Sequence, residues 1–278
     1  MGVAIVTDSS AHLPPESITR HDLEVVPLQI IIGGASYEDG FVTTDDLAEA
    51  MREWRPVSTS RPSPERFAQA YKAAAGTGAS AIVSVHLSGT MSGSLECAHL
   101  AAEEASVPVR VVDSRTIGMA LGFAALSGAR AAAEGASLDE VEDVTRRRAE
   151  KSSTLFYVDT LEYLRRGGRI GAAAGFLGTA LRVKPLLHLA EGRIAPLEKV
   201  RTSSRALSRM EELVLARAGD SEVDIAVQHV AASSRAEALA DRLRDRVPRL
   251  RTLHVTEVGP VIGAHVGPGT LGVAISPL

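Results

Sequence analysis

The chain has 278 residues, of which 45% are hydrophobic, 4% aromatic and 23% charged, and its formal net charge is -4. This length and apolar content are enough for one large or two moderate globular domains. The weakly acidic balance disfavours a nucleic-acid binder, because such proteins usually carry a strongly basic face. A single cysteine, Cys97, leaves no intramolecular disulfide and suits a reducing compartment, so we expect a cytoplasmic protein.

The first residues predict neither export nor membrane insertion. The chain begins with Met1-Gly2-Val3 and soon reaches the polar run Thr7-Asp8-Ser9, without the charged start and long apolar core of a signal peptide. No segment has the roughly twenty consecutive apolar residues that span a bilayer. We therefore expect a protein that is neither exported by this route nor embedded in a membrane.

Alternating strand and helix signals in the first half predict a parallel α/β sheet. Ser63-Pro64 and the capping box that starts at Ser137 mark two helix starts. Further helices are expected at about 92–105 and 116–134. Short apolar runs rich in β-branched residues predict strands at 3–6, 23–31, 81–86 and 109–112.

From residue 153 the pattern changes, and antiparallel pairing is expected. Two strand signals at 186–189 and 194–200 flank Glu191-Gly192, which predicts a hairpin. The other expected elements are strands at 154–158, 224–230, 252–258 and 271–275 and helices at 204–217 and 235–246. The predicted architecture is two α/β domains, residues 1–152 with a parallel sheet and residues 153–278 with a mixed sheet, and a ligand cleft between them.

Three runs of hydroxyl residues follow predicted strands, and they could converge on one pocket. They are Thr7-Asp8-Ser9-Ser10, Ser58-Thr59-Ser60 and the run from Ser88 to Ser94. Ends of parallel strands meet at one edge of a sheet, and the third run opens a predicted helix whose free N–H groups favour an anion. Taken singly, each run is more often a helix cap or a turn, for which these residue types are also preferred.

Several catalytic and cofactor motifs are missing or out of context. The run from Ser88 to Ser94 lacks the Gly-x-Ser-x-Gly elbow of Ser hydrolases. No His or Cys spacing indicates a metal site and no P-loop is present, so we expect neither a metal nor a cofactor. The segment Gly267-Pro268-Gly269-Thr270-Leu271-Gly272 matches the dinucleotide fingerprint, but no helix follows it before the final strand, so it is a predicted turn.

Two further features have open interpretations. His265 lies in a glycine-rich stretch that could press backbone against a ligand, although a lone histidine is more often structural. The basic run Arg165-Arg166-Gly167-Gly168-Arg169, with Lys199 and Arg201, could bind a phosphate or an acidic partner. The run could equally lie at the solvated C-terminal end of a helix, where basic side chains interact favourably with the helix dipole.

Together these segments resemble the DegV family, whose characterised bacterial members are fatty acid-binding proteins of the FakB type that act with a separate fatty acid kinase. The similarity extends over the whole chain. The matching segments, in chain order, are Thr7-Asp8-Ser9-Ser10-Ala11, Thr59-Ser60-Arg61-Pro62-Ser63-Pro64, Leu87-Ser88-Gly89-Thr90-Met91-Ser92, Asp113-Ser114, the run from Thr160 to Ile170, Lys184-Pro185, Glu198-Lys199-Val200-Arg201 and the stretch from Gly259 to Gly272.

The resemblance implies two α/β domains with an acyl chain buried between them and a carboxylate held by Ser and Thr side chains. It assigns the carboxylate to Thr59 and Ser60, to either Ser88 or Ser92, and to the neighbouring His265.

The resemblance also implies roles for residues around this head group. Arg169 and Arg201 match basic residues near the pocket mouth that would meet the kinase or the phosphoryl group. The chain departs from the commoner family pattern at Arg61 and His86, which could change the preferred acyl chains. The low aromatic content fits an aliphatic tunnel. The candidate tunnel residues are Ile117, Met119, Phe123, Phe176 and Leu177.

The expected function is therefore to bind a long-chain fatty acid and to present its carboxylate to a separate ATP-dependent kinase, with no catalysis by this chain alone. A link to phospholipid synthesis and a transient peripheral contact with a membrane belong to the same expectation. The alternative is an enzyme on a small oxygenated substrate, either a triose kinase relative with His265 or another histidine as the reactive group, or a Ser hydrolase. The sequence leaves acyl chain length, unsaturation, the identity of the kinase and the oligomeric state open.

Overall fold

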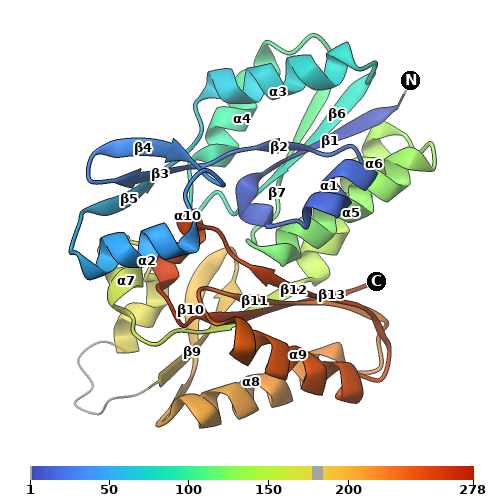
Figure 1. Cartoon of the computed structure of the whole chain (residues 1–278). Helices are drawn as coiled ribbons and strands as arrows, with labels where there is room; N and C mark the ends of the chain where they lie inside the picture. Colours follow the sequence, from blue (N-terminus) through green and yellow to red (C-terminus); the bar gives the residue numbers. More distant parts are fainter. Residues whose placement is uncertain (1, 177–183) are drawn as a thin grey trace.

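The computed structural model describes residues 2–176 and 184–278, and these contain strands from both halves of the chain with helices packed between and around them (Figure 1). The strands are β1 (Val3–Asp8), β2 (Glu24–Val26), β3 (Gln29–Ile32), β4 (Ala35–Glu38), β5 (Val57–Ser60), β6 (Ala81–His86), β7 (Val109–Asp113), β8 (Ser153–Tyr157), β9 (Lys184–Ala190), β10 (Arg193–Val200), β11 (Val223–His229), β12 (Leu250–Glu257) and β13 (Leu271–Pro277).

The helices alternate with strands in the first half and pair on one face in the second. The α-helices are α1 (Pro15–Arg20), α2 (Thr44–Arg52), α3 (Pro64–Gly76), α4 (Ser94–Glu103), α5 (Met119–Ala133), α6 (Leu138–Lys151), α7 (Glu162–Arg166), α8 (Ser203–Ala218), α9 (Ser233–Arg246) and α10 (Pro260–Val266), and the 3-10 helices are η1 (Ser9–Ala11) and η2 (Gly171–Phe176).

The described strands form one parallel sheet, one mixed sheet and one small antiparallel sheet. The order β2-β1-β6-β7 makes a four-stranded sheet that is parallel throughout. The order β10-β9-β8-β13-β11-β12 makes a six-stranded sheet that is antiparallel except where β11 pairs with β12. The fold class is confirmed, with a parallel sheet in the first half and a mixed sheet in the second. The third sheet, β4-β3-β5, was not predicted.

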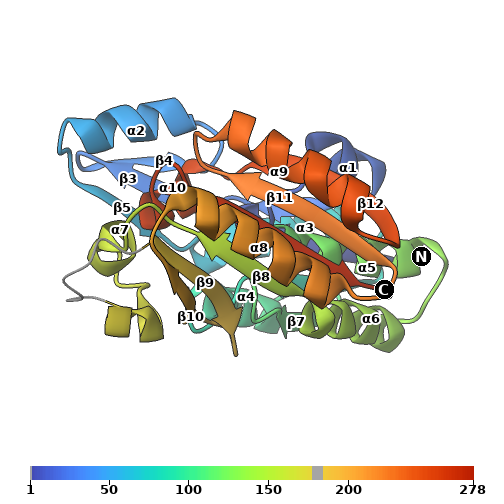
Figure 2. The same ribbon diagram turned by 90° about the horizontal axis from the view of Figure 1, so that it is seen from below.

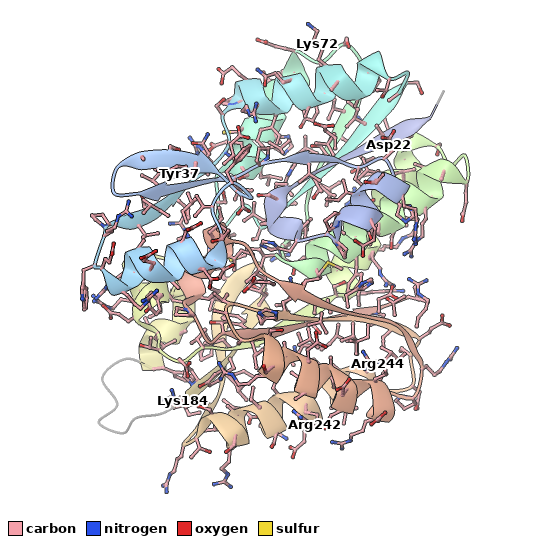
Figure 3. All side chains as sticks on the ribbon, viewed as in Figure 1. Asp22, Tyr37, Lys72, Lys184, Arg242 and Arg244 are labelled. Atoms are coloured by element: carbon pink, nitrogen blue, oxygen red, sulfur yellow. The ribbon has the colours of Figure 1, made fainter. Side chains whose placement is uncertain are left out.

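Helices α5 and α6 lie between the two larger sheets. Both contact the four-stranded sheet through β6 and the six-stranded sheet through β13, whereas α3 and α4 lie on the opposite face of the four-stranded sheet (Figure 1). Helices α8 and α9 contact each other and cover the outer face of the six-stranded sheet, as Figure 2 shows from below. Charged side chains such as Lys72 on α3 and Arg242 on α9 project from these outer layers (Figure 3).

The two halves of the chain share a continuous core. Ala226 of β11 and Ala274 of β13 belong to the same buried cluster as Met119, Phe123 and Leu126 of α5. The chain passes from the first group of sheets to the six-stranded sheet between α6 and β8, which begins at Ser153. The division into domains at residues 1–152 and 153–278 stays a prediction.

The predicted strand over residues 23–31 is wrong in its extent. The segment forms two strands, β2 and β3, which belong to different sheets. Pro27 separates them, and proline has no N–H group to continue a ladder of hydrogen bonds. This break sends the chain out of the parallel sheet and into the small antiparallel one.

The segment between Gly33 and Ser63 contains three elements that the sequence did not reveal: β4, α2 and β5. Thr43 caps α2 in a capping box with Asp46. The run Ser58-Thr59-Ser60, expected in a turn, lies inside β5 and pairs with β3. A strand position fixes the direction of each of these side chains, because successive residues point to opposite faces.

The predicted hairpin in the second half is confirmed. Glu191 and Gly192 connect β9 to β10 and have φ angles of 49° and 77°, as a two-residue type I′ turn requires. The glycine-rich stretch from Gly259 contains the short helix α10 before the predicted turn that leads into β13. In the described part of the chain, no helix combines the length and apolar character needed to cross a bilayer.

Candidate functional site

A cavity of about 350 Å³ is lined by residues from both halves of the chain, and its volume lies in the range of small-molecule sites. Its described apolar lining comprises Leu28, Leu87, Met91, Ile117, Phe156, Leu164, Leu189, Ile194, Val258, Val261, Ile262 and Val266. Its described polar lining comprises Ser10, Thr59, Ser60, Arg61, Ser92, Thr154, Arg169, Gln228, His229, His265 and Thr270.

One part of the cavity wall is polar because four separate segments converge there. His265 on α10 places Nε2 2.8 Å from Thr59 Oγ1 on β5. A Cβ atom on Gly167, at the end of α7, would overlap His265 Nδ1, so glycine is required for the ring to lie there. Arg169 then donates from Nε to the carbonyl of Met91, 3.2 Å away. These contacts join β5, the loop before α4, the end of α7 and α10.

The imidazole ring of His265 is neutral, and one of its two nitrogen atoms has no hydrogen-bond partner in the described structure. Burial, and to a smaller extent the nearby Arg169, lower the pKa of His265 to about 4. Its Nδ1 atom is buried and has no hydrogen-bond partner in the described structure. An orphaned N–H donor is rarer than an orphaned acceptor, which favours the tautomer with the proton on Nε2. His265 then donates to Thr59 Oγ1, and the Thr59 hydroxyl hydrogen is free to donate to a ligand.

Ser92 lines the cavity, whereas Ser88 supports the loop behind it. Ser92 Oγ lies 2.9 Å from Ser94 Oγ and accepts from the backbone N–H of Ser94 at the start of α4. Ser88 is completely buried, and its Oγ lies 3.1 Å from Thr90 Oγ1. A Cβ atom on Gly192 would overlap Ser88 Oγ, so Ser88 packs against the β9–β10 turn. Of the two serines, Ser92 is the one that the fold brings beside Thr59 in the lining.

Two arginines give this part of the cavity a positive charge. The guanidinium of Arg61 lies directly over Gly93, where a Cβ atom would overlap it, and its Nη1 is 3.4 Å from Glu96. Arg61 and Arg169 both line the cavity and both are exposed. Their charges favour an anionic group next to Thr59 and Ser92.

The predicted tunnel residues are distributed over different places. Ile117 lines the cavity. Met119 and Phe123 are buried in the core cluster around α5 and are absent from the described lining. The Nζ atom of Lys199 lies over the Phe176 ring, 4.3 Å from the ring centroid. Leu177 lies outside the described residues.

Arg201 lies in a groove of its own. This groove is formed by the end of β10 and by α8, and it is lined by Arg201, Arg205 and Arg209 together with Glu198 and Glu212. Arg209 forms a bidentate contact with Glu198 at 2.8 Å from both Nε and Nη2. The fold therefore does not bring Arg201 into the lining of the cavity that contains Arg169.

Several lining residues were not predicted. Phe156, Leu189 and Ile194 lie on β8, β9 and β10, and Val261 and Ile262 lie on α10. Apolar residues on strands are typical of any core, so their pattern gives no signal for a cavity. The glycine-rich stretch around α10 was the one local sign that backbone approaches a ligand in this region.

A buried network elsewhere has the connectivity of a Ser-His-Asp triad. His86 places Nδ1 3.0 Å from Asp8 Oδ2 and Nε2 2.6 Å from Ser84 Oγ, which also accepts from Tyr71. Asp8, Ser84 and His86 have no exposed surface, so no substrate can reach the serine. The geometry gives no support to a Ser hydrolase. His86, expected to influence acyl chain preference, is absent from the described lining, whereas Arg61 is part of it.

The described residues contain no group of three or more His, Cys, Asp or Glu side chains arranged to hold a metal ion. The polar part of the cavity instead offers hydroxyl groups, a neutral imidazole and guanidinium groups. The hydroxyl and guanidinium groups are hydrogen-bond donors suited to an oxyanion such as a carboxylate, whereas the imidazole N–H donates to Thr59.

The fold and this cavity define an α/β protein with a largely apolar pocket bordered by hydroxyl groups and positive charge. The chain belongs to the DegV family. The family model, described as "Uncharacterised protein, DegV family", matches residues 2–278.

Relatives and solved structures agree with this family. A DegV domain-containing protein of Streptomyces coelicolor is 57% identical over 275 residues, which cover 99% of this chain and 98% of the relative. A DegV family protein from Thermus thermophilus, described as fatty acid binding, has 34% identity, a TM-score of 0.95 and full coverage of both chains. DegV from Bacillus subtilis, described as a fatty acid binding protein, has 30% identity, a TM-score of 0.91 and full coverage of both chains.

Proposed function

We propose that this chain binds a long-chain fatty acid, with the acyl chain against the apolar cavity wall and the carboxylate beside Thr59, Ser60, Ser92 and His265. The observation that carries this proposal is the Thr59–His265 pair in the cavity wall, 2.8 Å apart, with a hydroxyl hydrogen left to donate. The fatty acid-binding descriptions of the similar Thermus and Bacillus structures support it.

The apolar lining supplies affinity, and the polar group supplies orientation. Burial of each methylene contributes about 0.8 kcal/mol, so a long acyl chain can offset the loss of translational freedom on binding. A carboxylate removed from water must be hydrogen-bonded. Neutral donors from Thr59 and Ser92 can meet this need while Arg61 and Arg169 provide a favourable potential at longer range.

The chemistry is assigned to a second protein. The sequence has no P-loop, so we propose that a separate ATP-dependent fatty acid kinase phosphorylates the bound carboxylate in the cytoplasm and that the acyl phosphate enters phospholipid synthesis. Arg169 is exposed beside the proposed carboxylate position and is the better placed contact for the kinase or the phosphoryl group. Arg201, in the groove along α8, would contact the kinase at a distance from the lipid. The fatty acid would be exchanged during a transient peripheral contact with a membrane.

The proposal is tested by the lipid that accompanies the protein. Denaturing extraction of protein made in bacterial cells, followed by mass spectrometry, should release a long-chain fatty acid in stoichiometric amount, and added fatty acid should raise the Tm of delipidated protein. Finding neither a bound acyl chain nor a thermal shift would overturn the binding proposal. Formation of acyl phosphate by the purified chain with ATP and fatty acid alone would overturn the assignment of chemistry to a kinase.

A further inference from the structure

A second cavity of about 420 Å³ lies beside η1, the segment between β4 and α2, and the start of α10. Among the described residues, it shares only Val258 with the lining of the first cavity. Its described lining comprises Asp8, Ser9, Ala11, His12, Leu13, Ile18, Val25, Asp39, Gly40, Val42, Thr43, Thr44, Glu257, Val258, Gly259 and Pro260. The proposed fatty acid site does not use this cavity.

His12 lines this second cavity and has a hydrogen-bond donor without a partner in the described structure. The backbone N–H of Gly259 donates to His12 Nδ1 over 3.2 Å, so this nitrogen is an acceptor and the proton of the neutral ring is on Nε2. Burial lowers the pKa of His12, which keeps the ring neutral near pH 7. Nε2 is buried and has no partner among the described residues. The fold therefore leaves a buried N–H group unpaired at this position.

Asp39 presents a matching acceptor. Its Oδ2 accepts from Ser9 Oγ over 2.7 Å, while its Oδ1 is buried without a partner in the described structure. A Cβ atom on Gly259 would lie 2.8 Å from Asp39 Oδ1 and 3.1 Å from His12 Cε1. The two side chains therefore pack against the same side of Gly259, and both residues line the second cavity.

We propose that this second cavity binds a small polyhydroxylated molecule, one hydroxyl of which accepts from His12 Nε2 and donates to Asp39 Oδ1. A hydroxyl is the simplest group that donates and accepts at once. Asp39 and Glu257 repel an anion, and an ammonium group would leave the His12 donor unpaired. Leu13, Ile18 and Val42 offer apolar surface to the carbon skeleton.

The arrangement is energetically costly without an occupant. A buried donor or acceptor left unpaired costs about 1–3 kcal/mol, and here two such groups belong to residues that line one cavity. His12 also adopts a positive φ of 47°, which is uncommon outside glycine. Asp8 lines the same cavity, but its carboxylate is already paired with His86, Ser10 and Leu87.

Glycerol is the probe for this site, and the amide of Gly259 is the reporter, because it donates to His12 directly. In ¹⁵N-labelled protein, titration with glycerol should shift the Gly259 resonance saturably. His12→Asn, which tolerates the positive φ, and Asp39→Ala should each raise the Kd for glycerol at least about tenfold. His21→Asn, at the end of α1, is the matched control and should leave the Kd unchanged.

A second comparison uses the wild-type protein only. The trimethyl ether of glycerol can accept from His12 but cannot donate to Asp39, so it should bind at least about tenfold more weakly than glycerol. A linear, non-saturating shift, equal binding of the ether, or an unchanged Kd in either variant would overturn the proposal and leave the two groups to ordered water. The thermal shift with fatty acid, measured on the same samples, reports the first cavity and separates the two proposals.

Discussion

Two pairs of a histidine and a hydroxyl group occur among the described residues, and they differ in what surrounds the ring. In the first pair, His86 contacts Ser84 through Nε2 and Asp8 through Nδ1, and none of the three side chains is exposed. In the second pair, His265 contacts Thr59 through Nε2, while its Nδ1 has no partner in the described structure and the residue lines a cavity.

The difference separates a structural role from the proposed binding role. The His86 ring is fully paired, and Asp8 behind it also accepts from the backbone of Ser10 and Leu87, so the network ties β1 to β6 and fixes two residues of the cavity wall. The His265 ring retains an open nitrogen and a low pKa, and its hydroxyl partner faces the cavity. Both pairs join a histidine Nε2 atom to a hydroxyl group. They differ in whether a cavity lies beside the pair, and we infer a binding role only where it does.

The largest expected effect is a loss of stability when His86 is removed from the buried His86–Ser84 pair. His86→Ala should lower the free energy of unfolding by about 3 kcal/mol, because it leaves the Asp8 carboxylate and the Ser84 hydroxyl underpaired in the core. Urea denaturation measures this loss. His99→Ala on the exposed face of α4 is the control, with an expected change within about 0.5 kcal/mol. An equally small change for His86→Ala would contradict the structural role.

Removing the hydroxyl group of the Thr59–His265 pair should reduce the affinity for fatty acid more than it reduces the stability of the fold. Thr59→Val keeps the shape of the side chain and removes the hydroxyl, so the affinity for oleic acid should fall at least about tenfold. Isothermal titration calorimetry on delipidated protein measures the affinity. Ser58→Ala, an exposed neighbour on β5, should bind oleic acid as the wild type does. Unchanged affinity in Thr59→Val would remove Thr59 from the site.

The His265 ring should report the ligand through its pKa. Because the folded-state pKa is lowered from 6.5 to about 4, the folded protein resists protonation, and stability is lost as the pH falls from about 6.5 through about 4. A bound carboxylate stabilises the charged ring and should raise this pKa. NMR titration of the ring with and without oleic acid measures both values. A midpoint near 6.5 in the ligand-free protein, or no upward shift with oleic acid, would contradict the account.

The smallest effect should separate the two candidate serines. Ser92→Ala removes a hydroxyl from the cavity wall and should weaken oleic acid binding severalfold, with little change in Tm. Ser88→Ala removes a buried hydroxyl from the supporting turn and should lower Tm more than it lowers affinity. The opposite result would assign the carboxylate to Ser88.

The fold could be predicted where local signals were strong. The capping box at Ser137 and the turn at Glu191 act within a few residues, and both are confirmed. The small sheet was missed because β5, Val57–Ser60, consists mainly of hydroxyl residues and is only half buried, so no apolar alternation marks it. Pro27 divided a strand that hydrophobicity alone would have continued.

The candidate site could be predicted mainly in its polar part. Thr59, Ser92, Arg169 and His265 come together in one wall, although they are far apart in the sequence. Apart from Ile117, the apolar wall could not be predicted, because a residue such as Phe156 has the same pattern as a core residue. Helix α5 lies between two sheets, and this position puts Met119 and Phe123 in the core. Whether the polar group holds a carboxylate stays a prediction.

The central claim is tested most directly by a crystal structure of this protein with oleic acid. We predict that the acyl chain lies against the apolar wall and that a carboxylate oxygen lies about 2.5–3.0 Å from Thr59 Oγ1. A carboxylate at Gln228 and Ser10 with the methyl end near Thr59, or a cavity without lipid at saturating oleic acid, would contradict it.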